Sequence, residues 1–406
     1  MWDRIKTLLI CICATAFLFG CSSGNQVTEP SAQPLKTELP LETADVDPGT
    51  FKDDDVEVMF VNVGKADASI IKCGDKAYII DTGTEQSVPR LFGAINYLGI
   101  KSVEAVFLTH IHKDHIGGLS ALLDNYTVGH VYRTVFSEIH KKENSIDKIV
   151  RKAGYTTEFF EAGDSLKLSD TVVLEALAPF EYNEDDENDN SLVLRLNNNG
   201  YTVLFAGDMQ FAEEDAILQK GRDIRSDVLR VGNHGNPDAT SSDFANAVDP
   251  AYAIISTDRT VDLDSANQRV LDLFSGSKVF ITDESGMGFL LSADREGNYG
   301  VKDIAVPDPA GTGISASAET DIQTLILTND SAEPVDLGRF IILTEKGNDV
   351  FVIPEGSVLK PGESLSVSGK DGAGDLIWRD KKKLWGQKKK ETRIYDKYGT
   401  MLLRID

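Results

Sequence analysis

Cysteine is scarce in this chain, and its scarcity excludes a fold held together by disulfide bonds. The sequence has 4 cysteines among 406 residues. Three of them lie in or directly after a short apolar run at the N-terminus, which leaves Cys73 with no partner in the remaining sequence. We expect Cys73 to be a small strand residue rather than a nucleophile. The fold must therefore be stabilised by its own hydrophobic core, which a chain of this length can build.

Positive charge and long hydrophobic runs are also in short supply. The formal net charge is −24, so a broadly basic nucleic-acid-binding surface is not expected. Beyond the first twenty-odd residues, no segment is apolar enough to cross a bilayer. The length predicts two folded domains, since 406 residues exceed what one ordinary core accommodates.

The N-terminus has the pattern of an export signal. Arg4 and Lys6 precede an apolar run over residues 8–19, which is short for a membrane span. The run ends in Leu-Phe-Gly-Cys at residues 18–21 and resembles a bacterial lipobox, in which the cysteine carries the lipid. The alternative is an ordinary cleaved signal with a chance cysteine.

The lipobox interpretation predicts the first two segments of the chain. We expect residues 1–20 to be a lipoprotein signal peptide. Cys21 would then be lipidated and would anchor an extracytoplasmic protein to the bacterial cell membrane. Residues 21–53 are rich in Ser, Thr, Pro, Glu and Asp and have few large apolar residues, so we expect a disordered tether.

Residues 54–305 show short apolar strands alternating with amphipathic helices. This alternation predicts layered α and β structure, with helices outside two packed sheets. The expected strands are 56–62, 68–73, 77–80, 103–108, 171–178, 192–196, 201–205, 228–231, 251–255 and 278–281. The expected helices are 87–98, a helix from residue 119 onward, 211–218, 241–247 and 267–274.

The C-terminal part differs in its pattern of apolar and turn residues. Residues 306–315 include two prolines and two glycines, which indicate a linker. Residues 316–406 show only strand-like segments separated by turn residues, which predicts an all-β sandwich. The expected strands are 324–327, 340–344, 350–353, 364–368, 392–395 and 401–405.

One short segment carries most of the recognisable chemistry. Three of the six histidines lie within His110–His115, directly after an expected strand. Imidazole nitrogens suit zinc and related borderline metals, and the carboxylate of Asp114 suits a second ion. Such clustering disfavours a merely solvated polar loop and predicts a metal site.

The His-x-His-x-Asp-His pattern of this loop resembles the signature of the metallo-β-lactamase superfamily. Ile-Ile-Asp-Thr-Gly at residues 79–83 resembles the family's first motif, whose aspartate, here Asp81, braces the metal loop without binding the metal. Leu-Phe-Ala-Gly-Asp at residues 204–208 matches the family's Gly-Asp motif. The resemblance implies a four-layer αββα fold and two divalent metal ions, zinc with manganese as the alternative.

The same resemblance implies the ligand set. His110 and His112 would bind one ion, and Asp114 and His115 the other. Asp208 would bridge both ions, and His234, at the end of a later strand, would be the remaining ligand. Asp114 and Asp208 are thereby the expected catalytic carboxylates.

A closer resemblance, over residues 54–300, is to the hydrolase domain of ComEC-type competence proteins, which import DNA in naturally transformable bacteria. It depends on Val63–Asp67, Asn188–Leu196 and Arg230–Gly235. It also implies three substrate contacts, Asn188, Ser191 and Asn233.

The chain departs from this family pattern in two of the three segments. The usual Gln-Gly is Lys65-Ala66, and the usual His-His-Gly is Asn233-His234-Gly235. The two histidines outside every motif, His130 and His140, are expected to be structural or solvated.

Residues 316–406 resemble lamin-tail domains, immunoglobulin-like sandwiches fused to secreted bacterial nucleases and other exported proteins. The turns at 334–337, 359–364 and 394–399 carry this resemblance. Within the domain, Arg379–Arg393 has a net charge of +6 around Trp385. It is either a solvated hairpin loop or a docking patch for polyanions such as DNA or wall teichoic acid, with the indole available for stacking. The six candidate contacts are Lys381, Lys382, Lys383, Lys388, Lys389 and Lys390.

These features predict an exported metal-dependent hydrolase. The leading hypothesis is a phosphodiesterase or nuclease that acts on extracellular DNA through a hydroxide activated by two metal ions. Since one fold serves many substrates, an esterase acting on phosphocholine or teichoic-acid decorations of the cell wall is the enzymatic alternative. The third hypothesis is a binding protein with a decayed metal site, because Asn233 stands where the family has histidine.

Overall fold

The computed structural model describes residues 56–198, 201–293, 299–344, 349–369, 372–378, 383–385 and 391–405. These residues all belong to one compact unit. The expected signal peptide, Cys21 and the tether lie outside the described residues. Within the described part, no helix has the length and apolar character needed to span a membrane.

The first sheet has eight strands in the order β15-β14-β1-β2-β3-β4-β5-β6. Its strands are β1 (Val56–Val61), β2 (Ser69–Cys73), β3 (Lys76–Ile80), β4 (Ser102–Leu108), β5 (Thr127–Arg133), β6 (Glu158–Phe159), β14 (Gly288–Ala293) and β15 (Tyr299–Ile304). All six side chains of β1 are buried. Cys73 is buried at the end of β2, in agreement with the prediction of a strand residue.

The second sheet has seven strands in the order β13-β12-β11-β10-β9-β8-β7. Its strands are β7 (Ser165–Lys167), β8 (Val172–Ala178), β9 (Val193–Asn198), β10 (Tyr201–Phe205), β11 (Val228–Arg230), β12 (Tyr252–Ile255) and β13 (Lys278–Ile281). Strands β10 to β13 run parallel to one another, so their carboxyl ends share one edge of the sheet.

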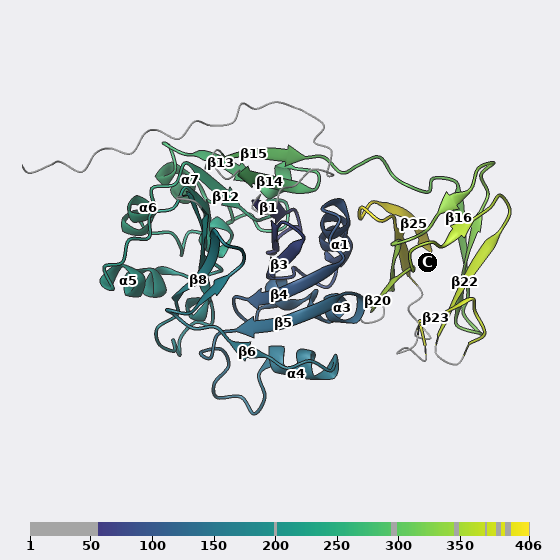
Figure 1. The fold of residues 1–406 in the computed structure, drawn as a ribbon, viewed down its shortest axis with the longest axis horizontal. Helices are drawn as coiled ribbons and strands as arrows, with labels where there is room; N and C mark the ends of the chain where they lie inside the picture. Colours follow the sequence, from purple (N-terminus) through teal and green to yellow (C-terminus); the bar gives the residue numbers. More distant parts are fainter. Residues whose placement is uncertain are drawn as a thin grey trace, which may run out of the picture. The chain divides into compact units, whose positions relative to one another are not determined.

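Helices cover the outer faces of the two sheets (Figure 1). Those beside the first sheet are α1 (Val88–Tyr97), α2 (Lys113–Ile116), α3 (Leu119–Asn125) and α4 (Ser145–Lys152). Those beside the second sheet are α5 (Phe211–Gln219), α6 (Ser242–Val248) and α7 (Gln268–Leu273). Three short 3-10 turns are η1 (Asn188–Asn190), η2 (Gly232–Gly235) and η3 (Thr282–Glu284). The predicted four-layer αββα arrangement is confirmed.

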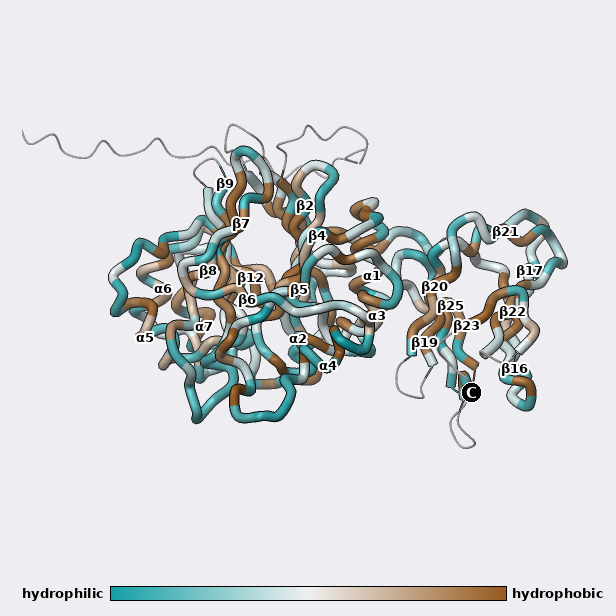
Figure 2. The backbone as a smooth tube through the Cα atoms, turned by 60° about the horizontal axis from the view of Figure 1, so that its bottom comes forward, coloured by the Kyte–Doolittle hydropathy of each residue, from teal (hydrophilic) through white to brown (hydrophobic). Residues whose placement is uncertain are grey.

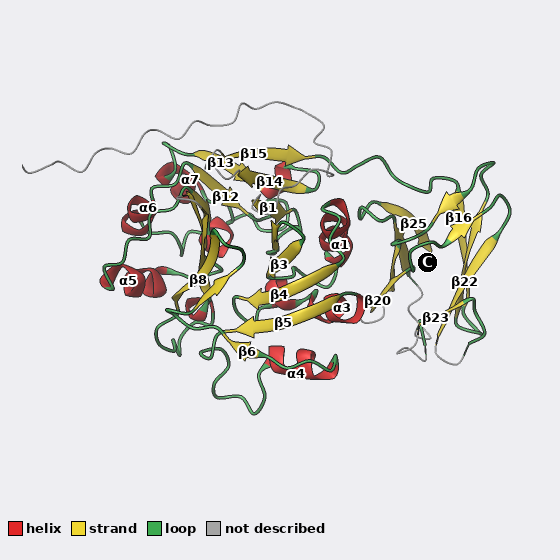
Figure 3. Cartoon of the chain, viewed as in Figure 1, coloured by secondary structure: helices red, strands yellow, loops and turns green. Residues whose placement is uncertain are grey.

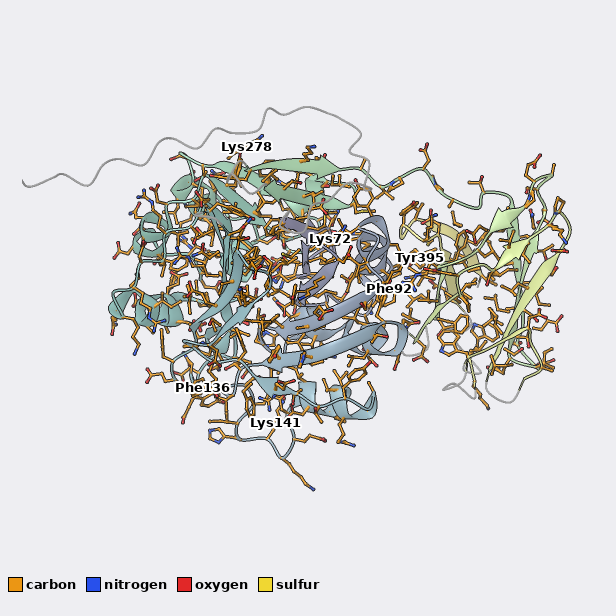
Figure 4. All side chains as sticks on the ribbon, in the orientation of Figure 1. Lys72, Phe92, Phe136, Lys141, Lys278 and Tyr395 are labelled. Carbon is orange, nitrogen blue, oxygen red and sulfur yellow. The ribbon has the colours of Figure 1, made fainter. Side chains whose placement is uncertain are left out.

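Three apolar layers hold these four structural layers together. Many of the strands and helices that supply their residues are coloured brown, for hydrophobic, in Figure 2. Because side chains alternate along a strand, β1 sends Phe60 into the layer between the two sheets and Met59 into the layer beneath α1. Figure 3, with helices in red and strands in yellow, shows the two sheets between outer layers of helices. Phe92 of α1, labelled in Figure 4, belongs to the layer beneath that helix.

The C-terminal region consists of strands and turns among its described residues (Figure 3). One sheet has the order β16-β17-β22-β23, a second has the order β20-β19-β24-β25, and β18 pairs with β21. The strands are β16 (Ile314–Glu319), β17 (Thr324–Asn329), β18 (Val335–Asp336), β19 (Ile341–Thr344), β20 (Asp349–Val352), β21 (Val358–Leu359), β22 (Ser364–Gly369), β23 (Leu376–Trp378), β24 (Thr392–Tyr395) and β25 (Met401–Ile405). The likeness to lamin-tail domains and the exact domain boundaries stay predictions.

The prediction that the indole of Trp385 is available for stacking is wrong. Its side chain is 2% exposed and belongs to the core of the C-terminal region. The indole Nε1 donates a hydrogen bond of 2.6 Å to Oγ1 of Thr392. The ring is therefore a core residue and is not available for stacking. Lys383 is exposed, while the other five lysines of the basic run lie outside the described residues.

The C-terminal strands also contact helix α1. Asn96 donates a hydrogen bond of 2.7 Å from Nδ2 to the carbonyl oxygen of Lys397, and its Oδ1 accepts one of 3.1 Å from Nε of Arg339. A β-carbon added at Gly93 would lie 2.3 Å from the carbonyl oxygen of Tyr398. Glycine is thus needed at this position of α1, because it allows the turn before β25 to approach the helix.

Candidate metal centre

The predicted ligands come together because strands of both sheets end at one place. Strands β3 and β4 are parallel in the first sheet, and β10 and β11 are parallel in the second. Side chains that follow the carboxyl ends of such strands meet at the same edge of the molecule. The residues concerned are Asp67 after β1, Asp81 after β3, His110–His115 after β4, Asp208 after β10 and His234 after β11.

Asp81 fixes the histidine loop through hydrogen bonds. Its Oδ1 accepts a bond of 2.9 Å from the backbone N–H of Thr109, and its Oδ2 accepts one of 2.8 Å from the hydroxyl of that threonine. Nδ1 of His115 lies 2.8 Å from the same Oδ2. Asp81 has φ of 59°, a left-handed conformation that aspartate tolerates better than most residues. The bond to Nδ1 leaves Nε2 of His115 directed at the centre.

Asp208 occupies the middle of the centre. Its Oδ2 lies 3.0 Å from Nε2 of His115, 3.3 Å from Nε2 of His234 and 3.9 Å from Nε2 of His110. Gly207 before it has φ of 56°, and a β-carbon there would lie 2.9 Å from Cβ of Ser191. The glycine therefore allows the tight turn that carries Asp208 into the site.

His234 comes from a strained turn after β11. Asn233 and His234 have positive backbone φ angles of 43° and 53°, a conformation that residues other than glycine rarely adopt. The turn is held by the backbone N–H of Asn233, which donates to the carbonyl oxygen of Gly207 at 3.2 Å. Nδ1 of His234 lies 2.7 Å from the carbonyl oxygen of Ser256 after β12, which again directs Nε2 at the centre.

Among the described residues, four side chains form a group able to hold a metal ion, and we call it the four-ligand cluster. Its members are Asp67, His115, Asp208 and His234. One ligand atom from each lies within 4.8 Å of the others, and all four residues are buried. His110 and His112, here called the two-histidine pocket, lie beside this cluster with Nε2 of His110 at 3.0 Å from Nδ1 of His112.

Asp114 lies at the rim of the centre. Its side chain is 22% exposed, whereas that of Asp208 is 3% exposed. Its Oδ2 is 3.4 Å from Nε2 of His234 and accepts a hydrogen bond of 3.0 Å from Nζ of Lys65. The carboxylate therefore faces both the cluster and an ammonium on the open side.

Two further charged residues, which no sequence motif marks as ligands, lie beside the predicted ligands. Asp67 and Arg230 form a buried ion pair between Oδ2 and Nη2. Nη1 of Arg230 also donates hydrogen bonds to the carbonyl oxygens of Gly207, at 2.6 Å, and Val231, at 2.8 Å. Both residues stand inside segments of the family resemblance, but their contact joins two different sheets and is seen only in the folded structure.

The electrostatics of the centre follow from burial and close approach. Burial alone would lower the pKa of His115, but the carboxylates of Asp208 and Asp81 raise this pKa well above its usual value. Burial and the neighbouring His115 lower the pKa of His110 well below its usual value. Burial opposes ionisation of Asp208, but His115 and His234 hold its pKa well below the usual range. Burial lowers the pKa of Arg230 to about 9.

The donor set fits a divalent metal ion. Nε2 of His115, Nε2 of His234 and Oδ1 of Asp208 are buried atoms without a normal hydrogen bond. Buried polar atoms left in this way are costly unless a ligand engages them. Imidazole nitrogens and carboxylate oxygens are the ligands that zinc and manganese take in proteins. The identities of the ligands and the number of ions stay predictions.

Two of the three predicted substrate contacts, Ser191 and Asn233, hydrogen-bond to the Gly207–Asp208 turn. The hydroxyl of Ser191 accepts a hydrogen bond of 3.1 Å from the backbone N–H of Asp208. Oδ1 of Asn188 is a buried atom without a hydrogen-bond partner, and Nδ2 of Asn233 donates to Asp238 at 3.0 Å. Their contact with substrate stays a prediction.

The other two histidines lie on the surface. Nδ1 of His130 is 2.6 Å from Oε1 of Glu158, and the histidine side chain is 55% exposed. His140 is exposed and lies edge-on to the ring of Tyr182, with centroids 5.4 Å apart. These surroundings agree with the expectation that both histidines are structural or solvated.

Fold and site together define a metal-dependent hydrolase domain, and comparison with known proteins identifies its kind. Residues 61–259 match the family model described as Metallo-beta-lactamase superfamily. The chain therefore carries a metallo-β-lactamase domain and has relatives among competence proteins.

Two relatives each match more than half of this chain. The chain is 27% identical over 265 residues to ComE operon protein 3 of Bacillus subtilis, covering 60% of this chain and 34% of that protein. It is 26% identical over 216 residues to Competence protein ComA of Neisseria gonorrhoeae, covering 52% of this chain and 28% of that protein. The matched part thus spans about a third of each relative's length. Among solved structures, the metallo-beta-lactamase fold protein YhfI of Bacillus subtilis aligns with a TM-score of 0.43 and 16% identity, covering 59% of this chain and 100% of that one.

Proposed function

We propose that this protein is an exported, lipid-anchored phosphodiesterase or nuclease that hydrolyses extracellular DNA with two divalent ions, zinc or manganese. The observation that carries the proposal is the convergence of buried imidazoles and carboxylates on Oδ2 of Asp208. Three imidazoles around one carboxylate oxygen are not needed to stabilise a protein core. They are needed to bind the metal ions of a metal-dependent hydrolase.

The chemistry divides between the metal and the chain. When bound, a divalent ion supplies a water of lowered pKa and stabilises negative charge on the phosphoryl oxygens. The chain's own groups hold and orient the ligands: Asp81 fixes His115, and the carbonyl oxygen of Ser256 fixes His234. The positions of these rings are therefore set before any substrate arrives.

An anionic substrate is supported by Lys65. Its side chain is 28% exposed, and its Nζ lies 3.0 Å from Oδ2 of Asp114. An ammonium at the open side of a metal centre is placed to donate a hydrogen bond to a phosphate oxygen. One relative is named Competence protein ComA, and the ComEC-type competence proteins that the sequence resembles import DNA, which favours a nucleic-acid substrate over a wall polymer.

Two further parts of the proposal concern where the protein works. Lipid on Cys21 would hold it at the outer face of the cell membrane, and the basic run Arg379–Arg393 would bind the polyanion. The lipobox and the net charge of +6 in that run support these two roles. Substitution of Cys21 by alanine should release full-length protein from the membrane fraction, and unchanged retention would contradict the anchor.

A substrate panel tests the proposed activity. Purified protein should hydrolyse bis-para-nitrophenyl phosphate and DNA faster than para-nitrophenyl phosphocholine or teichoic acid. Chelation or Asp208→Asn should lower the rate by on the order of 10³-fold, because the metal and its charge stabilisation are lost. Glu57→Gln is the matched control, since Glu57 is a buried carboxylate of β1 outside the centre. Diester hydrolysis that survives both chelation and Asp208→Asn would show that the site is misassigned.

A further inference from the structure

Asp67 does not belong to the histidine loop or the Gly-Asp motif, yet it lies within the four-ligand cluster. We propose that Asp67 is itself a metal ligand and that the four-ligand cluster is the tight-binding pocket of the centre, which takes the first divalent ion. The two-histidine pocket then takes the second ion more weakly. This inference concerns metal binding and holds whichever ester the enzyme hydrolyses.

The carboxylate of Asp67 is buried in a way that favours a second cation besides Arg230. The residue is 4% exposed, and one oxygen, Oδ2, contacts Nη2 of Arg230. The other oxygen, Oδ1, is buried without a hydrogen-bond partner. A buried carboxylate oxygen in this state is unfavourable unless a cation or donor engages it. The nearby ligand atoms of His115, Asp208 and His234 show where such a cation would sit.

The backbone holds Asp67 in this position. Its N–H donates a hydrogen bond of 3.0 Å to the carbonyl oxygen of Asp114, and its carbonyl oxygen accepts one of 2.7 Å from Gly83. The loop after β1 is thereby tied to the histidine loop and to the loop that follows Asp81. With its backbone held by these two hydrogen bonds and its side chain by Arg230, Asp67 is preorganised in the way that a ligand needs to be.

Charge balance favours one tightly bound ion. The carboxylates of Asp67, Asp81 and Asp208 are each at most 4% exposed, and the guanidinium of Arg230 is the permanent cation buried with them. Once metal binding leaves the imidazoles neutral, these three carboxylates and one guanidinium leave two negative charges, which a single divalent ion neutralises. Asp114 at the rim is already paired with Lys65. A second divalent ion would bring positive charge that this buried set does not offset.

The two-histidine pocket has fewer donors to offer. Besides His110 and His112, it shares Oδ2 of Asp208, which lies 3.9 Å from Nε2 of His110. Asn233 cannot add an imidazole, and its amide donates to Asp238 instead. With two imidazoles and a shared carboxylate, this pocket is expected to bind an ion less tightly than the four-ligand cluster.

Cobalt titration distinguishes a ligand from a mere ion-pair partner of Arg230, because cobalt absorbance depends on the number and type of its ligands. Metal-free protein should bind the first equivalent of Co²⁺ tightly and the second weakly. Asp67→Asn should weaken the first equivalent by at least about tenfold and change its visible spectrum, since even outer ligand supports contribute 10–100-fold. His110→Ala should weaken the second equivalent and leave the spectrum of the first unchanged.

Glu57→Gln is again the matched control. Glu57 is a buried carboxylate of β1 whose Oε2 lies 3.7 Å from Nζ of Lys72, which Figure 4 labels. It tests the same change from carboxylate to amide beside a cation, and it should leave both equivalents unchanged. If Asp67→Asn does not fold, Asp67→Glu keeps the charge facing Arg230 but displaces the carboxylate, and its cobalt spectrum should differ from that of the wild type.

Unchanged cobalt affinity and spectrum in the Asp67 variants would overturn the inference and make Asp67 only the counter-ion of Arg230. The proposed hydrolysis would survive that result, because it depends on Asp208 and His115. Conversely, a failed diester assay with a confirmed Asp67 effect would reject the substrate and keep the ligand.

Discussion

Nδ1 of His115 and Oδ2 of Asp81 lie 2.8 Å apart, and this contact sets the direction in which His115 faces the metal centre. Asp81→Asn should therefore lower metal affinity by roughly 10–100-fold, as loss of a ligand-orienting partner does. Asparagine suits the test because it tolerates the left-handed backbone at this position. Competition with a chromophoric chelator measures the effect, and an unchanged dissociation constant would show that the contact is dispensable.

Lys65→Met should raise the KM for a phosphodiester by about tenfold, which corresponds to one charge-assisted hydrogen bond of about 1.5 kcal/mol. Metal affinity should not fall, because the variant frees Asp114 from its ion pair. Lys76→Met is the matched control, since Lys76 is exposed at the start of β3, away from the strand ends that carry the site. A loss of metal affinity together with an unchanged KM would assign Lys65 to ligand support instead of substrate binding.

Glu213 of α5 should make the protein less stable as pH rises. The residue is buried, neither carboxyl oxygen has a normal hydrogen bond, and burial raises its pKa well above the usual value. The folded state thus binds a proton that the unfolded state releases near pH 4.5, so stability falls as pH rises from there through the folded pKa. Glu213→Gln should raise the melting temperature at pH 8 and flatten this dependence.

The neighbouring Glu214 provides the contrast for that measurement. Its two oxygens accept hydrogen bonds from the backbone N–H groups of Thr240, at 2.5 Å, and Ser241, at 2.7 Å. Glu214→Gln removes one acceptor and should lower the melting temperature. If Glu213→Gln destabilises the protein as much as Glu214→Gln, then Glu213 is also satisfied in the folded state.

Replacement of the six lysines in the basic run with serine should raise the apparent KM for long DNA. Residues 316–406 carry a net charge of −1 within a chain of −24, so the rest of the protein repels a polyanion. Each lost phosphate contact should also remove roughly one counterion from the salt dependence of binding. Hydrolysis of a small chromogenic diester should not change. Equal binding of long DNA by the variant would make this run a solvated loop.

The layers of the fold could be predicted from sequence because local patterns specify them. The strands expected at 201–205 and 278–281 coincide with β10 and β13, since each is an apolar run bounded by turn residues. Strands β14 and β15 were not expected. β14 is defined by its pairing with β1, at the other end of the domain, and no local pattern contains that information. Long-range pairing is the part of a β-sheet that a single sequence specifies least.

In the candidate site, too, the local pattern could be predicted from the sequence and the long-range contacts could not. The ligands in the histidine loop follow one another in sequence, so their spacing alone indicates a metal. Asp67 lies in the loop after β1, and Arg230 is the last residue of β11, a strand of the other sheet. Nothing in either segment specifies the other, and their contact arises only when the two sheets pack.

The pairing of β1 with β14 also bears on the order in which the protein can be assembled. Val56 faces Ala293 and Val61 faces Gly288, so the first strand of the domain finds one of its two neighbours only after almost all of the domain has been synthesised. Until then, one edge of β1 stays unpaired, which is the condition in which strands associate with other chains. A chain ended at residue 259, where the family match stops, would keep that edge open permanently. A piece of the chain that keeps both neighbours of β1 must therefore extend through β14.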